Sequence, residues 1–237
     1  DYLGFKSDDR TEPFKGSSGV YHPVMTEAVV RFQSNAIMEI FPASGPVLTK
    51  IVGNETPDKI KQSIRIKEEL NFQLTENMPE FRPEMEQLLF RLPLSGSVFK
   101  KTYYDSVYKR PCSSMVVAED LVVNFNTTNI ESAERIVHVS RWSPNKLKKM
   151  MRAGLYRTVS IPQPVTEVDE GKTKENELNG VEPTYSQKNS DYTVLEFHVN
   201  YNLPDPFADP DDIADPYIIT IEKSSQKVLG IRRNWAE

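Results

Sequence analysis

The feature of this sequence that most constrains its fold is a change in the spacing of apolar residues near Gly96. Before this glycine, apolar side chains recur every three or four residues, as on one face of an α-helix. After it they alternate, as in a strand with one covered face. The pattern predicts an α+β fold, in which N-terminal helices (1–95) pack against a mostly antiparallel β-rich layer (96–237).

Three helices are predicted in the first part. The first spans 23–41, because the residue before a proline avoids helical geometry. The second has Thr56 as its cap and Pro57 in its first turn. The third begins near Pro83, and Pro93 is expected to stop it. The apolar faces of the first and third helices are predicted as Met25, Val29, Phe32, Ala36 and Ile40, and as Met85, Leu88, Leu89 and Leu92.

The second helix (57–77) differs from the others because it carries two apolar stripes. A helix with two stripes is expected to make contacts on two sides. These contacts could lie between subunits, or the residues could cover the chain's own core. The stripes are Ile60 with Ile64, and Ile66 with Leu70 and Leu74.

The second part is predicted to hold strands at 98–104, 114–117, 121–123, 135–142, 192–201, 217–223 and 228–235. A short helix starts at Ser143 and ends at Gly154. Residues 163–190 have almost no apolar pattern, which predicts a mobile polar loop. Along the strand from Tyr192, Leu195, Phe197, Val199 and Tyr201 are expected on one face, opposite Glu196, His198 and Asn200.

No catalytic, cofactor-binding or metal-binding residue is predicted. His22, His138 and His198 are spread singly, without a positioned partner or ligand spacing. Cys112 is the one cysteine, so no intrachain disulfide forms and a reducing compartment is the simplest interpretation. Residues 53–59 resemble a phosphate-binding loop only faintly, and a helix start explains them.

Two charged clusters leave alternatives open. An acidic, proline-rich loop at 204–216 could hold calcium, but it lacks the pattern of an EF-hand and is expected to be a solvated turn. The short helix has a basic side, which either contacts phosphate or an acidic neighbour, or is a solvated face. The acidic loop carries Asp205, Asp209, Asp211, Asp212 and Asp215, and the basic side carries Lys146, Lys148, Lys149 and Arg152.

Net charge and the length of apolar runs limit the classes of function that this chain can have. The net charge of −5 argues against a dedicated nucleic-acid coat, which usually carries a basic surplus. No apolar run approaches the roughly 20 residues that span a bilayer, so no membrane partner is expected. The chain starts at Asp1 without a methionine and stops after a predicted strand, which suggests a portion of a longer protein.

Four stretches of sequence together resemble the portal (head-to-tail connector) proteins of tailed bacteriophages, of the podovirus and prophage branch. The resemblance covers most of the chain except 163–190. The stretches are Val20-Tyr21-His22-Pro23 leading into 26–33, Leu92-Pro93-Leu94-Ser95-Gly96-Ser97 with 99–105, Val117-Ala118-Glu119-Asp120-Leu121-Val122-Val123-Asn124 with Glu134, Arg135 and His138, and Pro216-Tyr217-Ile218-Ile219-Thr220-Ile221 with 228–235.

The resemblance implies a structural subunit without catalysis or cofactor, from the peripheral wing of a ring that is a dodecamer in the intact protein. Such a ring lies at a capsid vertex of the virion after assembly in the host cytoplasm. It serves DNA packaging, DNA ejection and tail attachment, with capsid, terminase motor and tail or adaptor proteins as partners. DNA passes through the channel without sequence-specific binding, and no residue here is carried over as a DNA contact. Stem and clip segments would follow Glu237.

Three alternatives remain at this point. The first is another virion assembly protein, such as a head-completion adaptor or baseplate subunit. The second is an enzyme that uses carboxylates of the acidic loop. Clustered carboxylates with raised pKa values in a closed cleft would favour this alternative. The third is a ligand-binding module, which a closed apolar pocket would favour.

Overall fold

A computed structural model of the chain describes residues 14, 16, 23–106, 108–163, 191–204 and 212–234. Within these residues, four α-helices and seven strands form an α+β fold, and every strand pairing is antiparallel, as predicted. The chain divides into two compact units, Asp1–Ala118 and Glu119–Glu237. The boundary follows Ala118 and not residue 95, because the first β-hairpin packs on the third helix and so belongs to unit 1.

The helices of unit 1 begin where the sequence predicts. Helix α1 is Val24–Ile40, α2 is Pro57–Phe72 and α3 is Phe81–Ser95. A π-helical turn, η1 (Gln73–Asn77), extends α2 toward α3. The hydroxyl of Thr56 accepts a hydrogen bond from the Lys59 amide (3.4 Å), which caps the start of α2.

The end of α3 differs from the prediction, because Pro93 lies inside the helix. In the last turn a proline removes a single helical hydrogen bond, and its fixed φ suits a helix. The helix ends at Gly96 instead, which adopts a left-handed φ of 74° and donates its N–H to the Leu92 carbonyl at 2.9 Å.

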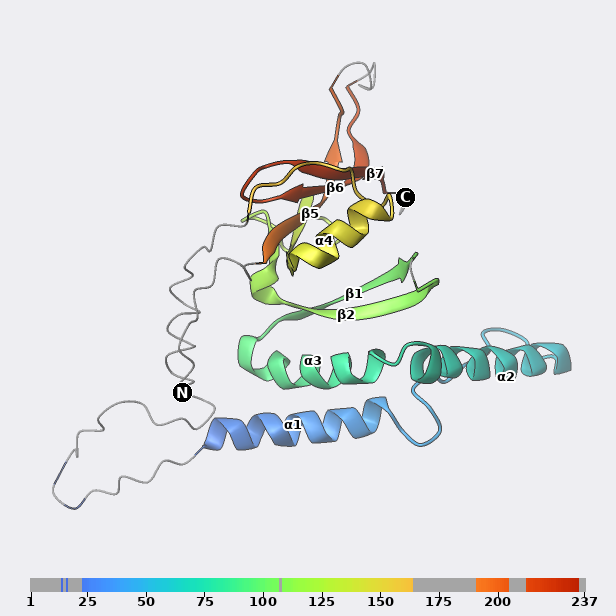
Figure 1. The fold of residues 1–237 in the computed structure, drawn as a ribbon. Helices are drawn as coiled ribbons and strands as arrows, with labels where there is room; N and C mark the ends of the chain where they lie inside the picture. Colours follow the sequence, from blue (N-terminus) through green and yellow to red (C-terminus); the bar gives the residue numbers. More distant parts are fainter. Residues whose placement is uncertain are drawn as a thin grey trace. The chain divides into compact units, whose positions relative to one another are not determined.

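Unit 1 is layered, with α3 between α1 and a hairpin (Figure 1). The hairpin consists of β1 (Val98–Asp105) and β2 (Arg110–Val117). Leu89 of α3 and Val116 of β2 are buried. A hydrogen bond also joins α3 to the hairpin: the Glu84 carboxylate accepts from the Met115 amide of β2 at 2.6 Å.

The predicted apolar stripe of α1 is covered only in part. Val29 is buried and Ala36 and Ile40 are half-buried, but Met25 and Phe32 are exposed. Gln33 lies on the covered face as well, and its side chain donates to the Glu86 carbonyl of α3 at 2.8 Å.

Unit 2 is a five-stranded sheet with one helix on it (Figure 1). The strand order is β3-β4-β5-β6-β7, so each strand pairs with its neighbour in sequence. Side chains of α4 and the sheet form the core, with Leu147, Val194 and Leu229 at its centre. The elements are η2 (Ala118–Asp120), β3 (Leu121–Val123), β4 (Arg135–Trp142), α4 (Pro144–Arg152), β5 (Tyr192–Tyr201), β6 (Asp215–Glu222) and β7 (Val228–Arg233).

The two faces of β5 are covered to different degrees. Helix α4 packs where Val194 lies, and this valine is almost completely buried. Leu195, Phe197 and Val199, the predicted apolar face, are only half-buried. The predicted contrast between a covered and an open face is therefore wrong, because Glu196 and His198 on the predicted polar face are as covered as Leu195 and Phe197, and Tyr201 is exposed.

The turn between β6 and β7 is organised by a buried carboxylate. One oxygen of Glu222 accepts from the amide (3.0 Å) and hydroxyl (2.6 Å) of Ser224, and the other accepts from the amide (2.7 Å) and hydroxyl (2.5 Å) of Ser225. Burial raises the pKa of this carboxyl, but the four hydrogen bonds to the ionised form outweigh it, so the pKa lies below its ordinary value.

Candidate interaction surface

Helix α2 is the one α-helix in the described part of the chain without a buried residue. In Figure 1 it extends past the end of α3, away from the layers of unit 1. We call residues 47–72, which comprise α2 and the extended segment before it, the α2 arm. A helix of 16 residues gains most of its stability from packing an apolar face, so this arm lacks the usual support.

The extended segment lies along α2 in the opposite direction. The Asn71 side chain accepts from the Val47 amide (2.9 Å) and donates to the Val47 carbonyl (3.1 Å). Further along, the Ser63 hydroxyl donates to the hydroxyl of Thr49 at 2.8 Å. At Gly45, which has a left-handed φ of 92°, a Cβ would lie 2.4 Å from the side-chain oxygen Oδ1 of Asn71. Glycine is therefore the residue that fits this close approach.

Seven large apolar side chains of the α2 arm are exposed. Leu48 and Val52 on the extended segment are the most open, at 74% and 90% of their surface. At about 100° per residue, the isoleucines and leucine of α2 fall on the two flanks of that segment. An apolar surface of this extent marks an interaction site in a soluble chain. The seven residues are Leu48, Val52, Ile60, Ile64, Ile66, Leu70 and Phe72.

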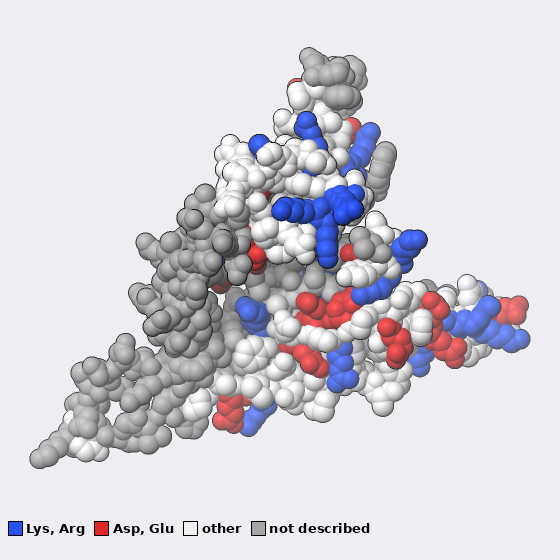
Figure 2. Space-filling model, viewed as in Figure 1, with Lys and Arg blue, Asp and Glu red and all other residues white. Residues whose placement is uncertain are grey.

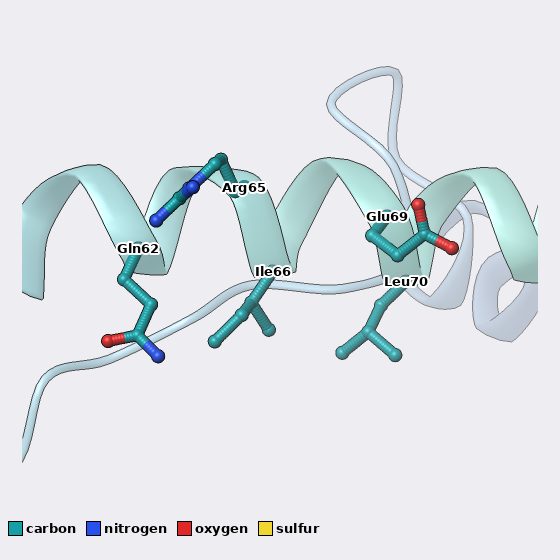
Figure 3. A pocket seen from close by; sticks show the side chains of 5 residues that line it. All are labelled: Gln62, Arg65, Ile66, Glu69 and Leu70. Carbon is teal, nitrogen blue, oxygen red and sulfur yellow. The ribbon is translucent and has the colours of Figure 1, made fainter.

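Each flank of α2 has a shallow, open hollow. One is lined by Ile64 together with Asp58, Lys61 and Arg65. The other is lined by Ile66 and Leu70 with Gln62, Arg65 and Glu69. Figure 3 shows Gln62, Ile66 and Leu70 projecting from the same side of the helix, with Arg65 turned away. An apolar floor with a polar rim is the usual composition of a protein–protein contact.

The charges of α2 are sorted along its axis. Its first eleven residues hold Asp58 and four cations, Lys59, Lys61, Arg65 and Lys67, whereas Glu68 and Glu69 follow and its last turn has no basic residue. A helix dipole favours the reverse order, with anions first and cations last. Figure 2 shows both signs of charge along this arm. The order therefore does not serve the isolated helix. It leaves a basic part, 57–67, with a net charge of +3 (four cations and Asp58) and an acidic part, 68–72, with a net charge of −2.

The structure describes two of the three histidines, and it gives His198 a carboxylate partner that residue spacing did not predict. His22 lies outside the described residues. His138 and His198 lie on β4 and β5 and are partly buried, not on an open face. The Nε2 atom of His198 is 2.8 Å from a Glu196 carboxylate oxygen on the same strand, which holds the ring in the sheet.

Cys112 lies inside β2 and not between strands as predicted. It is buried, and this burial raises the pKa of its thiol. A thiol with a raised pKa is a poor nucleophile at neutral pH. Its neighbour Arg110 donates to the Glu80 carboxylate at 2.7 Å, and this hydrogen bond lowers the pKa of Glu80. The side chains around Cys112 thus join the hairpin to the start of α3.

Most of the acidic loop lies outside the described residues, including Asp205, Asp209 and Asp211. Asp212 accepts a hydrogen bond from the Asn202 side-chain amide at 2.8 Å. Asp215 begins β6 and forms an ion pair with Arg233 at 2.7 Å. These two aspartates therefore have protein partners. The predicted polar loop at 163–190 lies outside the described residues from 164 onward.

Two searches of the described residues concern metal sites and membrane spans. They contain no group of three or more His, Cys, Asp or Glu side chains placed to hold a metal ion. None of the helices in this part of the chain combines the length and the hydropathy of a membrane span. At 53–59, the Lys59 ammonium donates to the Asn54 carbonyl at 3.1 Å, in keeping with a helix start.

Sequence reasoning found the two stripes of α2 but missed the segment beside it. Leu48 and Val52 belong to a short apolar run, 47–52, between two glycines. That run was the available signal, but its position along α2 depends on Asn71, which is 24 residues from Val47. Comparison with protein-family models and with curated protein sequences finds no match to this chain.

Proposed function

We propose that this chain is a structural subunit of a ring-shaped assembly of the bacteriophage-portal class, and that its α2 arm packs against a second copy. In this proposal the chain acts by binding its neighbours and not by catalysis. Its ring lies at a capsid vertex and serves the passage of DNA, together with capsid, motor and tail proteins. The resemblance of the four sequence stretches is the reason for choosing the portal class.

The observation that carries the proposal is the pair of apolar flanks on a helix without a buried residue. A subunit inside a closed ring has one neighbour on each side and needs two different surfaces. The two hollows of α2 provide two such surfaces, one floored by Ile64 and the other by Ile66 and Leu70.

The charge order of α2 favours another copy of the same arm as the occupant. If neighbouring arms are parallel and displaced by about eight residues, or about 12 Å, Glu68 and Glu69 of one arm lie beside Lys59 and Lys61 of the next. Every subunit then offers the same two surfaces, so the contact repeats around a ring. An antiparallel pair of arms would also match charges, but it would close as a dimer.

The first experiment is native mass spectrometry and electron microscopy of the intact protein. A closed ring with a central channel supports the proposal. A monomer, or a two-fold dimer, under assembly conditions contradicts it. Ile64→Asp and Leu70→Asp should each prevent the ring, because they place a charge on an apolar floor. Met38→Asp on α1, which is equally exposed but outside the arm, is the matched control and should leave the ring intact.

Charge reversal tests which surfaces meet. Lys61→Glu with Arg65→Glu makes both halves of α2 acidic, and Glu68→Lys with Glu69→Lys makes both basic. Each pair of changes should abolish assembly through like-charge repulsion. The variant with all four changes restores opposite halves and should assemble again. Failure of this rescue would show that the two halves do not meet each other.

A further inference from the structure

The basic side of α4 is a second surface, in unit 2, that the assembly proposal does not use. Residues 135–163 contain no Asp or Glu, in a chain whose net charge is −5. All the cations of this stretch are exposed. They are Arg135, Arg141, Lys146, Lys148, Lys149, Arg152 and Arg157.

Helix α4 gathers four of these cations on one face. Leu147 is buried in the core of unit 2, and Met151 packs beside it. With about 100° per residue, Lys149 and Arg152 fall on the side away from these two residues, and Lys146 and Lys148 fall on its two flanks. Figure 2 shows the resulting patch of basic side chains over α4. The patch spans the seven residues 146–152, or about 9 Å along the helix axis.

The stability of α4 does not account for this patch. Cations near a helix C-terminus interact favourably with the helix dipole, which explains Lys149 and Arg152 in the last turn. Lys146 lies in the first turn, where a cation is unfavourable and an acid is absent. The described residues provide none of the four cations with an ion-pair partner.

The helix that carries the patch is fixed to unit 2. Ser143 caps α4 by accepting from the Lys146 amide at 3.3 Å. The Lys146 ammonium lies 4.2 Å from the centre of the Trp142 ring, which itself packs on the core of unit 2. The backbone positions of the four cations are therefore set before a polyanion binds, which lowers the ordering cost of binding.

We infer that the basic patch of α4 binds the phosphate backbone of double-stranded nucleic acid, without sequence preference. The observation behind this choice is a dense array of exposed cations within 135–163, a stretch that contains no Asp or Glu. Phosphate contacts of this kind release counterions, so four contacts predict a log–log salt slope of about −3.6. Between about 50 and 200 mM salt, affinity should then fall by about 150-fold.

The inference does not depend on the ring proposal, because the patch belongs to a single copy. The test is fluorescence anisotropy of a short labelled DNA duplex, titrated with the full chain over a range of salt concentrations. The variant carries Lys146→Gln, Lys148→Gln, Lys149→Gln and Arg152→Gln. It should bind at least about tenfold more weakly and show a much smaller salt slope. Circular dichroism should be unchanged, because all four side chains are exposed.

A matched control removes the same number of charges elsewhere. Arg31→Gln, Arg82→Gln, Arg91→Gln and Lys109→Gln change four scattered, exposed cations of unit 1. Both variants have a net charge of −9, since −5 less four positive charges is −9. The control should bind the duplex within about twofold of the wild type.

Three outcomes would overturn the inference. The wild type could fail to bind the duplex at low salt. The two variants could lose affinity equally, which would make the effect one of net charge. Polyglutamate could compete as well as unlabelled duplex, which would identify the patch as a site for an acidic protein. Each result is distinct from a failure of ring assembly, which is measured without DNA.

Discussion

The two units of this chain differ in how they cover the apolar side of a helix. Unit 2 encloses the apolar side of α4 against its sheet, and Leu229 at the centre of this core has no exposed surface, although Phe125 of the same unit is fully exposed. Unit 1 encloses Leu89 and Val116 but leaves the apolar flanks of α2 open. The sheet of unit 2 has a helix on the face of its core, whereas α2 has only the extended segment beside it. In the proposed assembly, a second copy of the arm covers these open flanks.

The difference also concerns charge. In unit 2 the exposed face of α4 has one sign, and the dipole supports part of it. In unit 1 the charges of α2 oppose the helix dipole. Residues 57–67 carry a net positive charge and residues 68–72 a net negative charge. A surface of one sign suits a polyanion, and a surface of two sorted signs suits another copy of itself. The two units therefore point to different partners.

The largest expected effect is at the centre of unit 2. Leu229→Ala should lower its free energy of unfolding by about 3–4 kcal/mol, because it leaves a cavity in a closed core. Urea denaturation followed by tryptophan fluorescence measures this, since Trp142 packs on the same core. The control, Ile64→Ala on α2, should change stability by less than about 0.5 kcal/mol. Equal effects of the two variants would contradict the contrast between the units.

The next effect comes from the buried carboxylate at the β6–β7 turn. Glu222→Gln should cost about 2 kcal/mol, because an amide replaces an acceptor of four hydrogen bonds with a group that also donates. Glu27→Gln in unit 1 removes only an exposed ion pair with Arg31 and should cost less than about 0.5 kcal/mol. Denaturation at neutral pH compares the two variants.

The same carboxylate predicts a dependence on pH. The pKa of Glu222 in the folded chain is below its ordinary value of 4.5, so the ionised form stabilises the fold. This stability is fully present above the unfolded pKa and is lost as the pH falls through the folded pKa. The difference between the wild type and Glu222→Gln should therefore be largest near neutral pH and shrink below about 4.5. A constant difference across this range would show that the turn does not depend on the charge.

The smallest effect compares two helix caps of the same design. Ser143 and Thr56 each precede a proline and accept a hydrogen bond from the amide three residues later. Ser143→Ala should cost about 1 kcal/mol of global stability, because α4 packs on the core of unit 2. Thr56→Ala should leave global stability nearly unchanged and instead speed amide hydrogen exchange in the first turn of α2. Identical global costs would show that α2 is coupled to the core.

Helix limits were predictable because their signals are local. Thr56 and Pro57 start α2, and Ser143 and Gly154 bracket α4, as their cap geometry requires. Pro93 misled the prediction, since a proline in the last turn costs only one helical bond. The covered face of α1 was predicted only in part, because Gln33 gains its partner, the Glu86 carbonyl, from a helix residue 53 positions away.

The candidate surfaces were predictable to different extents. The two stripes of α2 and the basic side of α4 follow from residue spacing along single helices. Residue spacing did not predict the exposure of Leu48 and Val52 or the carboxylate turn at Glu222. Each of these features depends on neighbours that spacing along one element does not reveal.

The sequence by itself determined the α+β class, the order of the elements, their caps and the faces of α2 and α4, because helix and strand periods are local properties of the chain. Only the tertiary structure decided which apolar faces are enclosed. It placed the β1–β2 hairpin on α3, closed α4 over Val194 and Leu229, and left α2 open. Enclosure depends on contacts between residues far apart in sequence, and periodicity alone carries no information about which element reaches which face.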